Sequence, residues 1–185
     1  MKIRALFAVL ILLSGCAAPS KEPEYNQGVK SFRESDFSNA RLHWAAATEE
    51  LVRAAYNNLG YLLYFGLGGP AEPENAVALW TIAATNGDRE AQWHLTGAFE
   101  QGKGASRDLV TAYAWYRCAS ANFAAAPLVD QADADAVKDA EGAISRLVGK
   151  LSADQILAGE RLAKTYIESF RYSSKWLVTT AQKKK

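Results

Sequence analysis

The sequence predicts an all-α protein, a right-handed α-solenoid of about three helical hairpins followed by a C-terminal pair of capping helices. Three observations support this prediction. The chain repeats itself at an offset of 36 residues between Ala55 and Ala119, a period typical of stacked helical hairpins. Within each unit, apolar residues recur at spacings of three and four, as they do on one face of a helix. Between these stretches lie clusters of glycine and proline, which end helices.

The repeat keeps its register over many positions. The matched pairs are Ala55 with Ala91, Leu59 with Leu95, Gly66 with Gly102, Gly68 with Gly104, Glu72 with Asp108, Ala76 with Ala112, Trp80 with Tyr116, and Ala83 with Ala119. The second half of the unit also occurs 36 residues earlier, at Ala40, Trp44 and Ala47. We therefore expect three hairpins within residues 25–122.

Residues 1–15 have the features of a signal peptide. Lys2 and Arg4 precede a short apolar run from Ala5 to Leu13. The run is about half of the ~20 apolar residues that a membrane-spanning helix needs, and a basic start before a short apolar segment is typical of an export signal. We expect this segment to be removed.

The leader ends in Leu13-Ser14-Gly15-Cys16. These residues resemble the lipobox of bacterial lipoproteins, which implies cleavage before Cys16, a diacylglycerol on its sulfur and an acyl chain on the new amino group. Two or three acyl chains form a stable anchor, because each buried methylene contributes ~0.8 kcal/mol and one chain alone is marginal. A plain secretory leader with an incidental cysteine is the alternative. If the cell has an outer membrane, Ala17 and Ala18 resemble the residues of lipoproteins sent there.

Residues 16–24 contain two prolines and no helical periodicity, so we expect a short lipidated tether. Residues 25–33 then predict a first helix, Ser35-Asp36 a turn, and residues 39–49 a second helix. The loop of this first unit is tighter than the Gly-rich loops of the later units.

The second unit shows how each helix begins and ends. Ala55, Leu59 and Leu62 lie on one helical face, and Gly66 is placed to end the helix in the left-handed conformation. Glu72-Pro73-Glu74 is expected to begin the partner helix. The N–H groups of the first helical turn have no partner within the helix, so proline loses no hydrogen bond there. Acidic residues are favoured at the same end because it is the positive end of the helix dipole. The third unit follows the same plan.

After the third unit the repeat stops, because the position 36 residues beyond Ala91 is Pro127 and no Gly-x-Gly pair follows. Residues 130–149 predict a long alanine-rich helix. Ser152 and Gln155 match a capping box that opens a last helix. We assign residues 123–185 to capping helices, which cover the exposed apolar end of an array, and to a basic tail.

The spaced positions of the second and third units resemble the Sel-one-like repeat, a relative of the tetratricopeptide repeat. The matching residues are Leu59-Gly60, Gly66, Gly68, Ala76, Trp80 and Ala83-Ala84, then Ala91, Leu95, Phe99, Gly102, Gly104, Asp108, Ala112, Trp115-Tyr116 and Ala119. The resemblance covers residues 54–122, with a looser unit at 25–50, and implies a binding scaffold. Thr96 departs from it, since the family usually has glycine there, and so do Leu63 and Phe99, where tyrosine is usual.

Composition and charge exclude several classes of protein. With 49% hydrophobic and 22% charged residues over 185 positions, the chain has the composition of a folded domain. Removal of residues 1–15 leaves 19 basic residues against 20 acidic ones, whereas proteins that bind nucleic acid carry a concentrated basic field. Once Cys16 is lipidated, Cys118 has no cysteine to pair with, and a small buried apolar role is favoured over a reactive thiol.

Residues suited to catalysis or metal binding are sparse. His43 and His94 are the only histidines, and neither has a Cys, Asp or Glu nearby at metal-ligand spacing. The glycines at 66–69 and 102–104 lack the preceding strand and full spacing of a phosphate loop. We therefore predict no enzymatic activity, no cofactor and no metal site.

One helical face remains as a candidate binding surface. Asn57, Tyr61 and Tyr64 point away from the apolar stripe, and Trp93 and Glu100 take the equivalent positions on the next first helix. First helices line the concave surface of such solenoids, so these residues predict an aromatic groove for a peptide segment or a glycan. The alternative, which the sequence favours equally, is that Tyr61 and Trp93 only pack between adjacent repeats.

These observations predict a non-enzymatic scaffold or adaptor of the bacterial cell envelope. It would be held by the lipid on Cys16, in the outer membrane facing the periplasm, and would bind another protein. The alternative function is direct binding of peptidoglycan or another glycan. A hydrolase ranks below both, because no acid–base pair emerges from the sequence.

Overall fold

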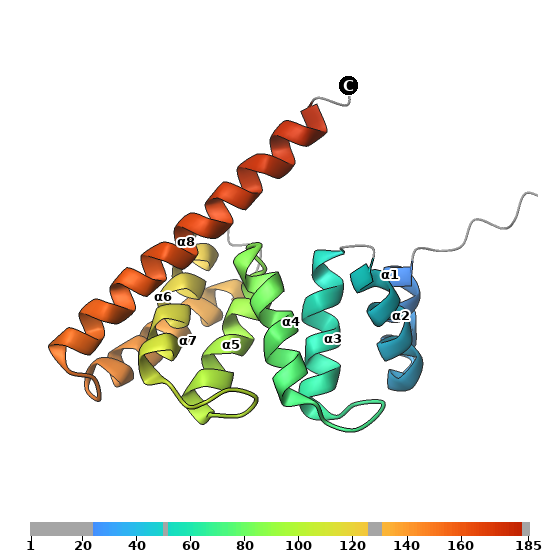
Figure 1. The fold of residues 1–185 in the computed structure, drawn as a ribbon, viewed down its shortest axis with the longest axis horizontal. Helices are drawn as coiled ribbons and strands as arrows, with labels where there is room; N and C mark the ends of the chain where they lie inside the picture. Colours follow the sequence, from blue (N-terminus) through green and yellow to red (C-terminus); the bar gives the residue numbers. More distant parts are fainter. Residues whose placement is uncertain (1–23, 50–51, 126–130, 183–185) are drawn as a thin grey trace, which may run out of the picture.

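The computed structural model describes residues 24–49, 52–125 and 131–182, with side chains at 24–49, 52–122 and 134–169. All regular elements in these residues are α-helices, which confirms the predicted fold class (Figure 1). The predicted signal peptide, Cys16, the tether up to residue 23 and the tail at 183–185 lie outside the described residues. The helices of the described part are α1 (Glu24–Arg33), α2 (Phe37–Glu49), α3 (Arg53–Phe65), α4 (Pro73–Thr85), α5 (Arg89–Gln101), α6 (Leu109–Ala125), α7 (Gln131–Val148) and α8 (Ala153–Gln182).

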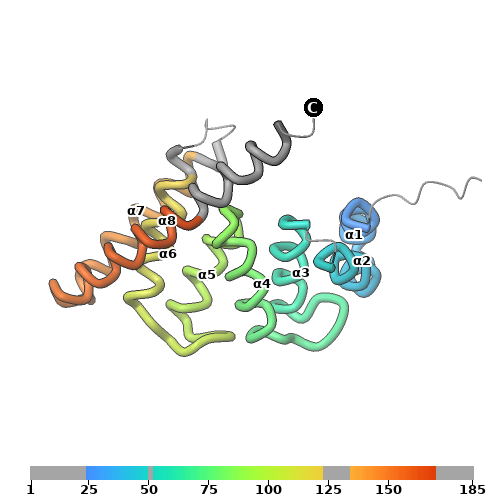
Figure 2. Tube along the Cα trace, turned by 45° about the horizontal axis from the view of Figure 1, so that its top comes forward, coloured from blue at the N-terminus to red at the C-terminus, as the bar shows by residue number. Residues whose placement is uncertain are grey.

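The helices form a row of hairpins. From α1 to α6, each helix packs against the next one in the chain, so α1–α2, α3–α4 and α5–α6 are the three predicted hairpins. Figure 2, turned by 45°, shows the same row with α1 and α2 at its N-terminal end. The two capping helices α7 and α8 both pack mainly on α6. None of the described helices combines the length and apolarity needed to cross a bilayer.

Alanines at equivalent positions form the seams of the stack. They are fully buried in all three hairpins, which confirms the register inferred from the sequence; they are Ala40, Ala76 and Ala112, and Ala47, Ala83 and Ala119. Small side chains at these places let the helix backbones approach closely, and the seams are then packed as densely as the rest of a protein interior.

Each of the first two hairpins places a tryptophan on a glycine. Trp44 packs against Gly28 and Trp80 against Gly60, so closely that a Cβ on either glycine would overlap the indole ring. Both indole N–H groups donate to a backbone carbonyl of the first helix. The second helix is thereby held to the first by the same contact in both hairpins.

The third hairpin uses a different pair at the same place. Thr96 stands in the position of Gly60, and Tyr116 in the position of Trp80. Both are buried, and the hydroxyl of Tyr116 lies next to that of Thr96 and donates to Glu100 Oε2 at 3.0 Å. A larger residue on the first helix is thus matched by a smaller ring on the second, and this is why the departure at Thr96 fits the fold.

We expect Tyr116→Trp to lower the free energy of unfolding by about 1–3 kcal/mol, because the larger ring overpacks against Thr96. Adding Thr96→Gly should recover most of this loss, apart from the contribution of the Glu100 hydrogen bond. Urea denaturation of the wild type, both single variants and the double variant measures the coupling. Equal losses with and without Thr96→Gly would contradict the proposed matching.

The Gly-rich loops connect the two helices within the second and third hairpins, and each also contacts the preceding hairpin. Gly66 and Gly102 end α3 and α5 with φ of 69° and 76°, as predicted for Gly66. Two residues later, Gly68 lies against the backbone of Phe37 and Gly104 against that of Pro73. Phe37 and Pro73 begin the second helix of the preceding hairpin, so each loop docks on the hairpin before it.

Polar and aromatic contacts fix the capping helices. Arg146 of α7 donates to the Glu100 carboxylate of α5, and Tyr166 of α8 stacks on Trp115 with ring centroids 4.0 Å apart. The predicted capping box is confirmed, because Gln155 N donates to Ser152 Oγ at 3.2 Å and Ser152 N donates to Gln155 Oε1 at 2.9 Å. The helix predicted over residues 130–149 is α7.

Candidate functional site

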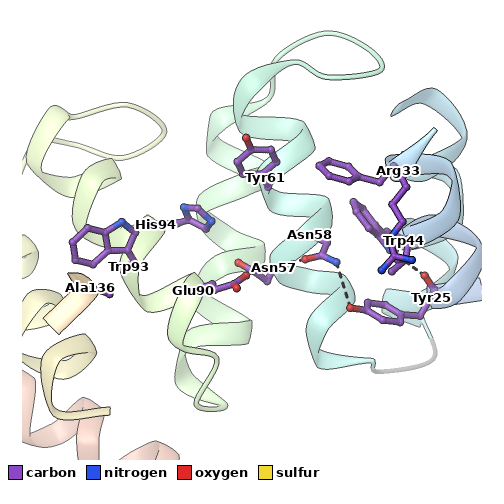
Figure 3. A pocket seen from close by; sticks show the side chains of 12 residues that line it. Tyr25, Arg33, Trp44, Asn57, Asn58, Tyr61, Glu90, Trp93, His94 and Ala136 are labelled. Atoms are coloured by element: carbon purple, nitrogen blue, oxygen red, sulfur yellow. Dashed lines mark hydrogen bonds between the residues drawn. The ribbon is translucent and has the colours of Figure 1, made fainter. Parts of the chain in front are cut away.

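A groove of about 710 Å³ opens along the face that the first helices form. Its walls come from α1, α3 and α5, with one residue each from α2 and α7 (Figure 3). We call it the aromatic groove, because its lining includes Tyr25, Phe32, Trp44, Tyr61 and Trp93. The hairpins present these helices side by side, so a single ligand in the groove would contact several repeats at once.

Aromatic rings connect the helices along the groove. The Tyr61 ring of α3 lies 6.5 Å from the Phe32 ring of α1 and 5.8 Å from the His94 ring of α5, measured between centroids. Phe32 in turn lies 5.5 Å from Trp44. Tyr61 therefore both packs between repeats and faces the groove, so the two interpretations of this residue are compatible.

The polar side chains gather where α3 and α5 begin. Asn57 is only 4% exposed, and its Nδ2 donates to Glu90 Oε2 at 3.0 Å. Its Oδ1 is buried and has no hydrogen-bond donor among the described residues. Nearby, Asn58 Nδ2 lies 3.5 Å from the Tyr25 hydroxyl (Figure 3). The groove thus combines apolar rings with acceptors at one end.

His94 forms part of the floor of the groove. Its ring stacks on Trp80 with centroids 4.6 Å apart and an interplanar angle of 24°. Burial lowers the pKa of His94 from 6.5 to about 4, because desolvation disfavours the imidazolium form. The side chain is therefore neutral at neutral pH.

We expect the free energy of unfolding to fall by about 1–3 kcal/mol as the pH drops from 6.5 to 4. Over this range the unfolded chain takes up a proton on His94, whereas the folded chain does so only near pH 4. Protonation therefore stabilises the unfolded state relative to the folded state. Urea denaturation at several pH values measures the slope. His94→Gln should remove the contribution of His94 to this slope, and the slope that remains comes from the carboxylates, which titrate in the wild type and in the variant alike. His43→Gln should retain the contribution of His94. A slope unchanged in His94→Gln would refute the assignment.

Three of the five predicted binding residues come together in the groove. Asn57, Tyr61 and Trp93 all line it, although Asn57 is buried rather than presented on the surface. Trp93 also contacts Tyr116 edge-on, at 5.7 Å between centroids. These residues lie on two neighbouring first helices, as their spacing of one repeat indicates.

The other two predicted residues lie apart from this groove. Tyr64 is buried against Trp80, with ring centroids 4.8 Å apart, and the Lys103 ammonium lies 4.1 Å from its ring centroid. Glu100 is engaged by Arg146 and Tyr116, and these bonds lower the pKa of its carboxyl group. Glu100 thus holds α7 in place.

Sequence reasoning missed the contribution of α1 to the groove. Tyr25, Phe32 and Arg33 come from this helix, which is set 32 residues rather than 36 before α3, as the pair Gly28 and Gly60 shows. With that shorter offset, Tyr25 is the equivalent of Asn57. The shorter loop of the first hairpin, visible in the sequence, could have indicated this offset.

Outside the groove, the sequence also made predictions about Cys118 and about metal binding. Cys118 is fully buried, which confirms its apolar role, and burial raises the pKa of its thiol to about 12. Among the described residues, no group of three or more His, Cys, Asp or Glu side chains is arranged to hold a metal ion.

The sequence model of the Sel1 repeat matches residues 53–88 and 90–122. These segments hold the hairpins α3–α4 and α5–α6 up to residue 122. The match agrees with the Sel-one-like resemblance of the sequence. The search of curated proteins found no match.

Two solved structures are similar to the chain. A protective antigen present in uropathogenic Escherichia coli strains, which displays an SLR fold, is 28% identical with a TM-score of 0.67; the match covers 82% of this chain and 32% of that one. A Sel1 repeat protein from Oxalobacter formigenes is 24% identical with a TM-score of 0.57, over 77% of this chain and 55% of that one. The chain thus spans about a third and about half of these proteins.

The repeat register, the stacked hairpins and the matched segments agree with one another. Residues 53–88 and 90–122 are Sel1 repeats, and they form the hairpins α3–α4 and α5–α6 of the α-solenoid.

Proposed function

We propose that the chain is a non-enzymatic scaffold of the bacterial cell envelope that binds a segment of a partner protein in the aromatic groove. The observation that carries this proposal is the groove itself, which is lined by the first helices of successive hairpins. A Sel1-repeat solenoid is commonly a protein-interaction scaffold. The groove supplies aromatic anchoring surfaces of the kind that dominate protein interfaces.

Membrane attachment is the second part of the proposal. The sequence Leu13-Ser14-Gly15-Cys16 supports lipidation of Cys16, which would anchor the solenoid to the membrane through the tether. Two or more acyl chains suffice for a stable anchor. We place the protein in the outer membrane, facing the periplasm, on the basis of Ala17 and Ala18.

Photo-cross-linking in cells tests the groove. A benzophenone amino acid at Val29, which lines the groove, should cross-link to a partner that mass spectrometry identifies. Trp93→Ala should abolish this cross-link, because the groove loses its largest ring on α5. The same probe at Leu42, which is 67% exposed on α2 and outside the groove, serves as the control.

Two results would contradict groove binding. One is a partner that cross-links equally from positions 29 and 42, and the other is a cross-link from position 29 that persists in Trp93→Ala. Circular dichroism must show that Trp93→Ala keeps its helical fold, because Trp93 also contacts Tyr116. Loss of the cross-link together with loss of the fold would support packing alone.

We expect Cys16→Ala to abolish incorporation of radiolabelled palmitate and to release the protein from the membrane fraction. The residue would no longer offer a sulfur for the diacylglycerol. Cys118→Ala is the matched control, because this buried cysteine is not a substrate for lipidation. Labelling that continues in Cys16→Ala would refute the anchor and leave the groove proposal unaffected.

A second candidate function is binding of peptidoglycan or another glycan. The combination of aromatic rings with the carboxamides of Asn57 and Asn58 in one groove favours it, because sugars offer apolar faces and hydroxyl groups together. Sedimentation with purified sacculi distinguishes this candidate from binding of membrane-extract proteins. Trp93→Ala should reduce binding to sacculi if the glycan is the ligand.

A further inference from the structure

We propose that the partner segment places one basic side chain, lysine or arginine, at Glu90, next to an apolar or aromatic side chain held by the rings of the groove. This inference rests on the proposed function, since it names the chemistry of the segment that the groove binds. It comes from the state of two polar groups, Glu90 and Asn57, in the free protein.

Glu90 is a carboxylate without a cation. The residue is exposed, lines the groove and forms no ion pair among the described residues. One of its oxygens, Oε2, accepts the hydrogen bond from Asn57 Nδ2 at 3.0 Å. The neighbouring Arg53 donates to the backbone carbonyl of Asn86 at 2.7 Å instead. The negative charge at this end of the groove is therefore available to a partner.

Asn57 determines how Glu90 is presented. A carboxylate accepts hydrogen bonds and cannot donate them, so Glu90 pairs with the amide nitrogen of Asn57. The Oδ1 atom of Asn57 therefore points away from Glu90. That oxygen is buried without a donor among the described residues, and an acceptor in this state costs free energy. Because Oδ1 is buried, the group that a partner reaches is the exposed Glu90 carboxylate, and a lysine or arginine head group offers several donors to it.

The rest of the groove limits the partner to one basic residue. Arg33 lies on the opposite wall, in α1 (Figure 3), and forms no ion pair among the described side chains. Its charge repels a segment that is basic throughout. His94 adds no second cation at neutral pH, because its pKa is lowered to about 4. The rings of Tyr61 and Trp93 favour an apolar neighbour.

Peptide selection tests the inference without a known partner. Phage-displayed peptides of twelve random residues would be selected on the immobilised full-length chain in detergent. A peptide whose binding requires Trp93 would then be synthesised twice, as selected and with its basic residue replaced by norleucine. The dissociation constants are measured for the wild type, for Glu90→Gln and for Glu74→Gln. Glu74 is an exposed carboxylate on α4, outside the groove, so Glu74→Gln controls for net charge.

The expected result is enrichment of lysine or arginine at a constant distance from an apolar or aromatic residue. Glu90→Gln should weaken the selected peptide about tenfold or more, as loss of a charge-assisted hydrogen bond does, and Glu74→Gln should not. The norleucine peptide should bind wild type and Glu90→Gln equally.

Other results would contradict the basic-residue inference, the proposed function or both. Trp93-dependent peptides without an enriched basic residue, or with equal affinity for Glu90→Gln, would overturn the inference and leave the proposed function standing. Failure to select any Trp93-dependent peptide would count against both. Binding of sacculi that depends on Trp93, in the absence of such peptides, would identify a glycan as the occupant.

Discussion

Trp80→Ala is expected to lower the free energy of unfolding by about 3–5 kcal/mol, the usual cost of removing a buried tryptophan. Trp80 is 1% exposed and lies at the centre of the core that the α3–α4 hairpin shares with α5. Its ring contacts Tyr64 and His94, and its Nε1 donates to Asn57 O at 3.1 Å. No single side chain nearby can fill the space of an indole.

The variant should also disturb the aromatic groove. His94 rests on the Trp80 ring, and Asn57 belongs to both the core and the groove. Urea denaturation followed by circular dichroism at 222 nm measures the loss of stability, and Trp93→Ala, in which the ring is only partly buried, should lose less. A Trp80→Ala variant within about 1 kcal/mol of the wild type would show that the hairpin does not depend on this contact.

Gly104→Ala is expected to destabilise the protein by about 2–5 kcal/mol, the sum of two effects. Gly104 has φ of 81°, a conformation that side chains disfavour. A Cβ at this position would lie 2.3 Å from the Pro73 carbonyl oxygen and 2.6 Å from its carbonyl carbon. Because both are backbone atoms at the start of α4, the loop would have to move away from the preceding hairpin.

Gly142→Ala is the matched control. Gly142 lies within α7, and a Cβ there would meet nothing within 4 Å. Alanine in a helix interior is favoured over glycine by about 0.5–1 kcal/mol, so this variant should be slightly more stable. Thermal and urea denaturation of both variants gives the comparison. Similar stabilities for the two would contradict the docking of the Gly104 loop.

The repeating core could be predicted from the sequence because each unit solves the same packing problem. Ala76 and Ala112 are buried at the same seam, and Trp44 and Trp80 pack on equivalent glycines. A side chain in a repeat meets the same neighbours as its counterpart one period away. The spacing therefore contains tertiary information that is absent from a sequence without repeats.

The binding surface could be predicted only in part. Helical spacing brought Asn57, Tyr61 and Trp93 to one face, and they line one groove. Tyr64 shares that face, but it lies in the last turn of α3, where Trp80 and Lys103 cover its ring. Glu100 lies in the last turn of α5, where Arg146 from the nonrepeating α7 binds its carboxylate.

The sequence by itself determined the helices, because apolar residues recur at spacings of three and four within each of them. It also determined the alanine seams, because these alanines recur every 36 residues. Only the tertiary structure decided which polar groups on the first-helix face have a hydrogen-bond or ion-pair partner and which do not. Glu90 is left without a cation and Asn57 Oδ1 without a donor among the described residues. That outcome depends on Asn57 of α3 and Glu90 of α5, which meet only when the two hairpins stack.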